Sequence, residues 1–290
     1  MTLKGKVAII SGANQGLGFE IAKQFVLAGA NIMICARNHE KLQQSQQALM
    51  PFTKAEQQIL IKVCDVSIKE EVDNLITSAI KEFGTIDILV ANAGIHGAKG
   101  CAEEVDWDEW CRAIDVNLKG TVLQCRAVLP LFKNRKHGKI LLLSGGGATK
   151  PMPYFSAYAA SKAAVVRFGE TLSQEVLPFN IDVNMIAPGA LNTALLLDVL
   201  EAGPNAVGET AYQQALKQQQ TGGNSLENAA KLCVFLSSND SNGITGKLIS
   251  AVWDPWHSLA QKMNELKHSD IYTLRRIVPE DRHLNWEECK

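Results

Sequence analysis

Short apolar runs alternate with longer amphipathic stretches along most of the chain. The run at residues 7–10 is Val-Ala-Ile-Ile, and similar runs follow at residues 31–36, 59–64, 86–90, 139–143, 181–186 and 244–250. Nearly continuous apolar runs of this length are typical of parallel strands that are buried on both faces. The stretches between them repeat apolar positions every three or four residues, as helices do. The pattern therefore predicts one α/β domain over residues 1–251, with a doubly wound parallel sheet covered by helices.

Two helix boundaries can be predicted from local signals. Ser67 with Glu70 three residues later predicts a capping box at the start of a helix that runs to Glu82. The long helical stretch after residue 107 is expected to continue to about Leu129, where Pro130 interrupts it.

Two segments depart from the alternation. Residues 194–224 contain Gly203-Pro204, three consecutive glutamines and two consecutive glycines. An insertion of this size after a strand is expected to form a mobile lid at the carboxyl edge of the sheet. Residues 252–290 form a C-terminal extension, and its Trp253 and Trp256 are too large to be left in water. We expect residues 252–278 to be ordered and to pack against the lid or a neighbouring subunit.

The composition is that of an ordinary globular protein. Hydrophobic residues make up 46% of the chain, charged residues 20%, and the formal net charge is −1. This balance gives no reason to expect a nucleic acid or an anionic membrane as a partner. No apolar run approaches the roughly 18 residues of a membrane span. The seven cysteines lack zinc-type spacing, so we interpret them as small buried hydrophobes, and we expect no metal site and a cytoplasmic location.

A glycine-rich turn follows the first predicted strand directly, and a helical pattern starts immediately after it. Glycines allow the backbone to approach a pyrophosphate, whose charge is favoured at a helix N-terminus. The spacing Gly-x-x-x-Gly-x-Gly differs from the commoner Gly-x-Gly-x-x-Gly, so the turn alone leaves open whether it binds a dinucleotide. The candidate cofactor-binding residues here are Gly12, Asn14, Gln15, Gly16, Leu17 and Gly18.

The end of the second predicted strand bears on the choice of cofactor. Folds that bind NAD commonly place an acidic residue there, which accepts the ribose 2′-hydroxyl. This chain has Ala36 and Arg37 instead. A guanidinium can bind a 2′-phosphate bidentately, whereas a carboxylate would repel it. Arg37 therefore favours NADP over NAD, and the alternative is a surface arginine at a strand end.

A candidate proton-transfer group lies between residues 141 and 167. Ser144 ends the fifth predicted strand, and Tyr158 and Lys162 stand four residues apart in an alanine-rich stretch that predicts a helix. A phenol has an ordinary pKa of about 10, and we expect the Lys162 ammonium to lower the pKa of Tyr158. A hydroxyl, a tuned phenol and a lysine together form a proton-transfer device. By itself, however, Tyr-x-x-x-Lys is also common on solvated helix faces.

With these pieces placed, the chain resembles the short-chain dehydrogenase/reductase family over roughly residues 4–249. Each motif alone is weak, but they occur in the order of that family. The resemblance implies a Rossmann-type sheet and an NAD(P)-dependent oxidoreductase. The motifs are the glycine turn, Asp65 after the third strand, Asn92-Ala93-Gly94 after the fourth, Asn117, Ser144, Tyr158 with Lys162, and Pro188-Gly189 followed by Thr193.

The resemblance also implies a role for each residue. Tyr158 would exchange a proton with the substrate oxygen, Ser144 would hydrogen-bond that oxygen, and Lys162 would tune the phenol and hold the nicotinamide ribose. Asn117 would support its helix and hold a water that connects Lys162 to solvent. The cofactor contacts implied are Asp65 and Val66 to the adenine, Asn92, Ala93 and Gly94 on the adenosine side, and Pro188, Gly189 and Thr193 at the nicotinamide.

Two features depart from the pattern of the family. Its catalytic serine usually stands 13 residues before the tyrosine, and that position here is Gly145. A one-residue insertion in the loop, helped by three consecutive glycines, would bring Ser144 into place. The extension at residues 252–290 replaces the short ending that is common in the family. It resembles a subset associated with cell-surface polysaccharide synthesis, which suggests a sugar or nucleotide-sugar substrate.

We therefore expect an NADP-dependent oxidoreductase that transfers a hydride between nicotinamide and a secondary alcohol or ketone of a small molecule. A β-ketoacyl-type reductase shares the pattern, but it needs a basic patch for its carrier and none is evident near the lid. A catalytically silent NADP-binding regulator is favoured slightly by Gly145 and opposed by Asn117, Tyr158 and Lys162. The family commonly pairs two helices across a two-fold axis, and the apolar faces of both helices here predict a homodimer or homotetramer.

Overall fold

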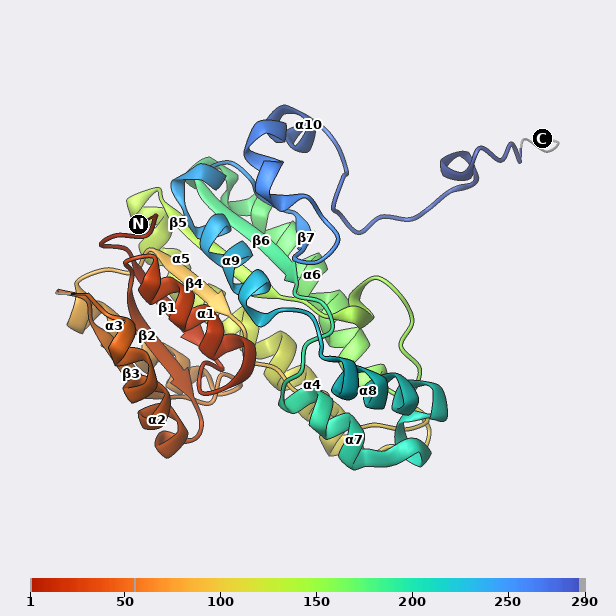
Figure 1. Cartoon of the computed structure of the whole chain (residues 1–290). Helices are drawn as coiled ribbons and strands as arrows, with labels where there is room; N and C mark the ends of the chain where they lie inside the picture. The colour runs from red at the N-terminus through yellow and green to blue at the C-terminus, as the bar shows by residue number, and fades with distance from the viewer. Residues whose placement is uncertain (1, 55, 287–290) are drawn as a thin grey trace.

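The computed structural model describes residues 2–54 and 56–286, and within these residues seven parallel strands form one sheet (Figure 1). The strand order is β3-β2-β1-β4-β5-β6-β7, so the chain winds outward in both directions from the centre, as the alternation predicts. The strands are β1 (Val7–Ser11), β2 (Asn31–Ala36), β3 (Ile59–Val63), β4 (Ile88–Ala91), β5 (Gly138–Leu143), β6 (Ile181–Ala187) and β7 (Leu248–Ser250).

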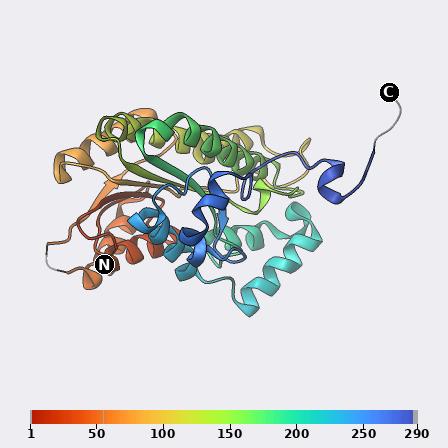
Figure 2. The ribbon, with the colours of Figure 1, turned by 90° about the horizontal axis from the view of Figure 1, so that it is seen from above.

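Helices cover both faces of the sheet, as Figure 2 shows. Neighbouring strand residues point to opposite faces, so Ile10 packs in one core with α1 and α9, and Ile9 packs in the other with α3, α5 and α6. The helices are α1 (Gly16–Leu27), α2 (His39–Leu49), α3 (Lys69–Phe83), α4 (Trp107–Ile114), α5 (Gly120–Arg135), α6 (Ser156–Val176), α7 (Ala194–Val207), α8 (Glu209–Thr221), α9 (Leu226–Ser237) and α10 (Met263–Lys267). No helix among the described residues is long and apolar enough to cross a bilayer.

The start of α3 differs from the predicted capping box. The N-cap position is Ile68, which has no side chain able to accept a hydrogen bond. The Ser67 hydroxyl instead donates to Oδ1 of Asp65 at 2.6 Å, and the Ser67 N–H donates to the same oxygen at 2.9 Å. The capping prediction is wrong because the carboxylate of Asp65, two residues back, takes the serine that would have capped the helix.

The predicted interruption at Pro130 is also wrong, because α5 continues through this residue to Arg135. Proline removes one backbone donor from a helix. Val128 and Phe132, on either side of it, are completely buried in the core beneath the sheet. This burial favours an unbroken helix, and tertiary packing outweighs the local cost.

The last strand is shorter than the apolar run predicts and begins at Leu248. Asn184 of β6 explains the late start, because its side chain accepts from the Lys247 N–H and donates to the carbonyl of Ile244. Gly246 lies between these two contacts with a φ of +71°, which is incompatible with a strand.

Residues 194–224, the predicted lid, form α7 and α8, which pack against each other. A kink at Gly203, with a φ of +73°, lies inside α7. The lid covers the N-terminal part of α6: Leu196, Val199 and Ala215 form an apolar cluster with Phe155 and Tyr158. The lid therefore packs over the predicted catalytic tyrosine.

The C-terminal extension packs mainly against the body of its own chain. Trp256 is 5% exposed, its ring centroid lies 5.9 Å from that of Phe235 in α9, and it joins the same core as Leu259 and Leu266. The apolar face of α9 is what these side chains cover, and at the start of the extension Val252 lies beside Asn224 of the lid, at Gly189. Trp253, which was also expected to be buried, is 75% exposed.

The extension also bonds to the sheet, where the N–H of Leu248 donates to the carbonyl of Tyr272 at 2.7 Å. Its last described residues run away from the body (Figure 1). A contact with a neighbouring subunit stays a prediction. Residues 287–290, which include Cys289, lie outside the described residues.

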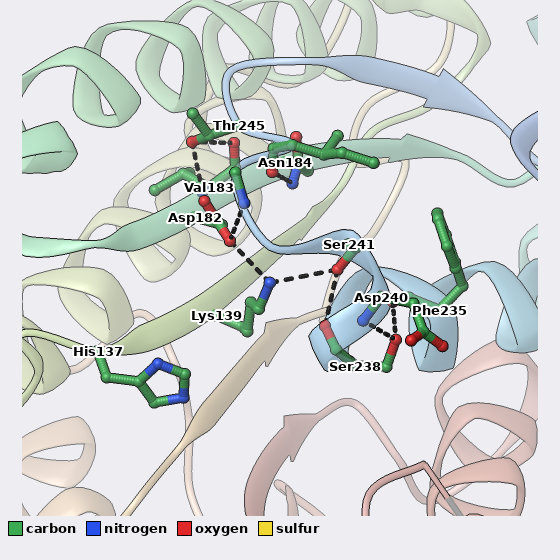
Figure 3. Close-up of polar contacts among 12 residues, drawn as sticks. His137, Lys139, Asp182, Val183, Asn184, Phe235, Ser238, Asp240, Ser241 and Thr245 are labelled. Atoms are coloured by element: carbon green, nitrogen blue, oxygen red, sulfur yellow. Dashed lines mark hydrogen bonds and ion pairs between the residues drawn. The ribbon is translucent and has the colours of Figure 1, made fainter. Parts of the chain in front are cut away.

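A buried ion pair joins β5 and β6 near their amino ends. Nζ of Lys139 lies 2.7 Å from Oδ2 of Asp182 and 3.2 Å from Oγ of Ser241, as Figure 3 shows. Asp182 also accepts from the N–H of Gly243. Burial lowers the pKa of Lys139, and the carboxylate of Asp182 opposes that shift. The pair ties the connection before β7 to the sheet, at the edge opposite the predicted site.

Candidate active site

A cavity of about 1410 Å³ opens at the carboxyl edge of the sheet. Its lining includes every predicted cofactor-binding and catalytic residue except Asn117. Parallel strands end at the same edge, so their following loops meet there although they are far apart in sequence. The lining residues predicted from the sequence are Gly12, Asn14, Gln15, Gly16, Leu17, Gly18, Arg37, Asp65, Val66, Asn92, Ala93, Gly94, Ser144, Tyr158, Lys162, Pro188, Gly189 and Thr193.

The glycine turn lies between β1 and α1, and neighbouring protein atoms leave no room for a Cβ on Gly12 or Gly18. Gly12 has a φ of +64°, and a Cβ there would stand 2.9 Å from Cα of Ala93. A Cβ on Gly18 would stand 2.8 Å from the carbonyl carbon of Gly12. The N-cap residue of α1, Gln15, makes no side-chain capping bond. The first N–H groups of α1 are thus available to an anion in the cavity.

Asn92 fixes this turn from the end of β4. Its side-chain amide donates to the carbonyl oxygens of Ser11, at 2.8 Å, and Gly12, at 3.2 Å. The Ser11 hydroxyl accepts from the N–H groups of Asn92 and Ala93 in return. The two loops are therefore held as one unit at the adenosine side of the cavity.

Two cations and a carboxylate line the end of the cavity beside β2 and β3. Arg37 and Lys41 are both exposed, and within the described residues neither has an ion-pair partner. Burial alone would raise the pKa of Asp65, but hydrogen bonds from Ser67 and the charge of Arg37 outweigh it and lower that pKa. Asp65 is therefore ionised at neutral pH, and its charge interacts with that of Arg37.

Asn117 lies in a π-helical turn (Asp115–Lys119) between α4 and α5. Its Nδ2 donates to the Ile95 carbonyl at 2.8 Å and to Oγ of Ser161 at 2.9 Å, and its Oδ1 accepts from the Ile95 N–H at 2.9 Å. Asn117 thus ties the loop after β4 to α6. A Cβ on Gly94 would lie 3.2 Å from Oδ1 of Asn117 and 3.3 Å from Nζ of Lys162, so these two groups flank one small space.

Ser144 and Gly145 follow β5 and meet Tyr158. Ser144 is 4% exposed, and its Oγ has no hydrogen-bond partner among the described residues. A Cβ on Gly145 would stand 2.9 Å from Cζ of Tyr158 and nearer still to its hydroxyl oxygen. The backbone of Gly145 therefore faces the phenol hydroxyl directly. Ser144 lies one residue earlier, with a buried hydroxyl that still needs a partner.

The pKa of Tyr158 differs from the expectation. Burial raises the pKa of Tyr158 to about 12 and lowers that of Lys162 to about 8. Nζ of Lys162 donates to the carbonyl of Leu143 at 2.8 Å and lies 5.8 Å from the centroid of the tyrosine ring. The predicted lowering of the phenol pKa is therefore wrong for this arrangement, because desolvation dominates and the ammonium is engaged elsewhere.

Thr193 stands opposite the glycine turn, at the N-cap position of α7. A Cβ on Gly16 would lie 3.3 Å from Cγ2 of Thr193, so the two loops nearly touch. Gly189, which follows Pro188 after β6, has a φ of +90°. These residues line the cavity across from the glycine turn.

The residues present fit a nicotinamide dinucleotide. The glycine turn offers space and free N–H groups for a pyrophosphate, and Arg37 and Lys41 offer positive charge at the adenosine end. At the opposite end, the hydroxyl of Ser144, which is unpaired within residues 2–54 and 56–286, lies next to Gly145 and so close to Tyr158.

Sequence reasoning missed four residues of this site. Lys41 could have been found from its place four residues beyond Arg37, in the first turn of the next helix. Gly145 was noted only as a departure, and the structure brings it against the tyrosine hydroxyl. His96 and Asp198 meet across the cavity at a separation of 102 residues, and no local signal links them.

Comparisons with known proteins agree with this geometry. A family model described as short chain dehydrogenase matches residues 6–202. Dehydrogenase/reductase SDR family member 4 of Homo sapiens is 32% identical over 249 residues, which cover 85% of this chain and 86% of that protein. The 3beta-hydroxysteroid dehydrogenase 1 of Eggerthella lenta is 35% identical over 245 residues, covering 84% and 91%. The crystal structure of levodione reductase superposes with a TM-score of 0.79 at 26% identity, covering 89% of this chain and 99% of that one.

Proposed function

The chain belongs to the short-chain dehydrogenase/reductase family of NAD(P)-dependent oxidoreductases, and we propose that it transfers a hydride between NADP and the carbon of a secondary alcohol or ketone. One observation carries the proposal. The buried hydroxyl of Ser144, which has no hydrogen-bond partner in the part of the chain that the structure describes, lies next to Gly145, which faces the hydroxyl of Tyr158. Buried polar groups are nearly always paired, so a substrate oxygen that completes this arrangement is the natural partner.

In this proposal Tyr158 is the proton donor. Because burial raises the pKa of Tyr158 to about 12, the phenol keeps its proton at neutral pH, which suits the reduction of a ketone. Ser144 holds the substrate oxygen, and Lys162 holds the ribose and replaces the proton of the phenol. Asn117 fixes the loop beside Lys162 and holds the water that links it to solvent. When bound, NADPH would supply the hydride and leave as NADP.

The preference for NADP rests on Arg37 and Lys41. Arg37 follows β2 directly and Lys41 lies in the first turn of α2; both are exposed, and neither has an ion-pair partner among the described residues, so together they match the charge of a 2′-phosphate. Asp65 follows β3 and not β2, so it does not stand at the position of the acidic residue that NAD enzymes use after β2.

The substrate is proposed to be a ketone on an apolar skeleton. Beside Tyr158 the cavity is lined by Met152, Phe155, Leu196 and Val199, which offer no hydrogen bonds to the hydroxyls of a sugar. A relative named as a hydroxysteroid dehydrogenase is consistent with this class. The apolar lining weighs against the sugar or nucleotide-sugar that the C-terminal extension suggests.

The test is NADPH oxidation by the purified protein with three probes: α-tetralone, a 3-ketosteroid and the ketose xylulose. We expect turnover with the apolar ketones and little with xylulose. Tyr158→Phe is expected to lose roughly 100-fold in rate, the cost of removing a general acid, while its NADPH affinity stays the same. NADPH binding without turnover of any probe would refute the reductase and favour the silent regulator.

A further inference from the structure

His96 is a buried imidazole beside the predicted catalytic tyrosine. It follows the Asn92-Ala93-Gly94 loop at the end of β4 and is 6% exposed. Its ring meets the ring of Tyr158 edge to face, with centroids 4.8 Å apart and planes at 78°. A second edge-to-face contact, with centroids 5.3 Å apart, joins it to Phe155. The imidazole thus packs against the phenol ring from the side of the β4 loop.

The imidazole is held in turn by the lid. Nδ1 of His96 donates to Oδ2 of Asp198 at 3.0 Å, and Asp198 lies in α7. Nζ of Lys99 lies 2.9 Å from the other oxygen of the same carboxylate. A carboxylate on Nδ1 fixes the orientation of an imidazole ring, as it does for histidines in other active sites. The lid therefore determines how the His96 ring stands against Tyr158.

Gly145 explains why Tyr158 needs contacts from His96 and the lid. The backbone of Gly145 leaves room for the phenol hydroxyl but offers it no side chain, and a Cβ at this position would displace the phenol. The ring of Tyr158 must then be fixed from other directions, and His96 and the apolar residues of the lid supply those contacts.

We propose that His96 and Asp198 are positioning residues for Tyr158, so that closure of the lid over the cavity orients the phenol for proton transfer. The proposal rests on the reductase activity proposed above. Neither residue donates the proton itself. When α7 lifts, Asp198 leaves His96 and the tyrosine ring loses a lateral support, so chemistry is confined to the closed state.

The kinetic test uses His96→Leu and Asp198→Ala with α-tetralone and NADPH. A 1 Å misplacement of a catalytic group can cost up to about 100-fold in rate, and we expect kcat to fall between about tenfold and that limit while the KM for NADPH is unchanged. The deuterium isotope effect from labelled NADPH should rise, because chemistry becomes slower relative to product release. A purely structural role would lower the active fraction and leave the isotope effect as it is.

Two comparisons sharpen this test. Glu201→Gln removes a charge from the same helix at an exposed position that has no contact with His96, and its kinetics should match the wild type. His96→Phe keeps the aromatic ring and should recover part of the rate lost in His96→Leu. In a His96→Leu background, Asp198→Ala should have no further effect, since residues that act through one contact are not additive. Additive losses would overturn the proposal.

An experiment without turnover separates this proposal from the reductase itself. The protein has four tyrosines, so the ¹³Cζ signal of Tyr158 can be assigned in labelled protein by its absence in Tyr158→Phe. Asp198→Ala should shift or broaden this signal, and Glu201→Gln should not. If no probe is reduced but the signal responds to Asp198→Ala, the reductase fails and the coupling stands. If the Tyr158 signal is unchanged in Asp198→Ala, the coupling between the lid and Tyr158 is overturned, whether or not any probe is reduced.

Discussion

Gly145→Ala should be one of the most damaging small substitutions in this protein. The backbone of Gly145 has a φ of −164°, which any residue can adopt, so the substitution brings no backbone strain. Its effect is steric, because the new methyl group would stand 2.9 Å from Cζ of Tyr158 and closer to the hydroxyl oxygen. Ordinary contact begins at about 3.4 Å, so the phenol hydroxyl must move.

The size of the loss follows from that movement. The hydroxyl has to shift by about 1 Å, and a misplacement of this size can cost on the order of 100-fold in rate. This corresponds to about 2.7 kcal/mol of transition-state stabilisation. The glycine turn lies at the other end of the cavity, so NADPH affinity should not change.

The assay compares kcat for α-tetralone reduction and NADPH affinity in Gly145→Ala and Gly146→Ala. Gly146 is a matched control, because a Cβ there meets nothing within 4 Å. We expect Gly146→Ala to behave as the wild type in both measurements. If Gly145→Ala keeps more than about a third of the wild-type kcat, a shift of about 1 Å in the phenol hydroxyl does not impair catalysis, and the expected loss is refuted.

Further outcomes are expected from four other changes. In fluorescence titrations, Arg37→Ala should lower the affinity for NADPH by roughly tenfold or more, the cost of a charge-assisted hydrogen bond, and leave the affinity for NADH unchanged. An equal loss of affinity for both cofactors would show that Arg37 does not bind the 2′-phosphate. Burial lowers the pKa of Lys162 from 10.5 to about 8, so the unfolded chain binds this proton more tightly than the folded protein does. In urea titrations between pH 8 and pH 10, the free energy of unfolding of the wild type should therefore rise relative to that of Lys162→Met. A difference between the two proteins that stays constant with pH would contradict the lowered pKa. Truncation after Ala251 should lower the melting temperature sharply, because it uncovers the core face of α9, whereas truncation after Leu274 should leave it nearly unchanged; equal melting temperatures would show that the extension does not stabilise the body. Phe168→Glu, in the groove between α5 and α6, should convert a homodimer or homotetramer to smaller species in light scattering; a wild type that is already monomeric would refute the oligomer.

The strands and the cofactor loop were predictable because their signals are local. A strand buried on both faces must be apolar along its whole length, so each run of the sheet could be recognised from a few neighbouring residues. The spacing of Gly12, Gly16 and Gly18 likewise reflects the close approach of one loop to its neighbours. Tyr158 and Lys162 share a helix face at a separation of four residues, and the structure brings both to the cavity.

The outcome of competition between alternative partners was not predictable. Ser67 bonds to Asp65 rather than capping α3, and α5 passes through Pro130 because the core buries the residues on both sides. The pKa of Tyr158 depends on how much water the lid and the loops exclude, and on where Nζ of Lys162 finds its acceptor. Neither quantity is encoded by the spacing of the two residues.

The sequence by itself determined the sheet, its cofactor edge and the set of residues that line it, since these follow from periodicity and from motifs in one order along the chain. Only the tertiary structure decided that Gly145 faces the phenol, that the extension covers α9, and that Asp198 of the lid reaches His96. The physical reason is that each of these depends on the direction of side chains brought together from separate loops. Such directions are set by close packing between segments that are far apart in the sequence, so they cannot be read from any one segment.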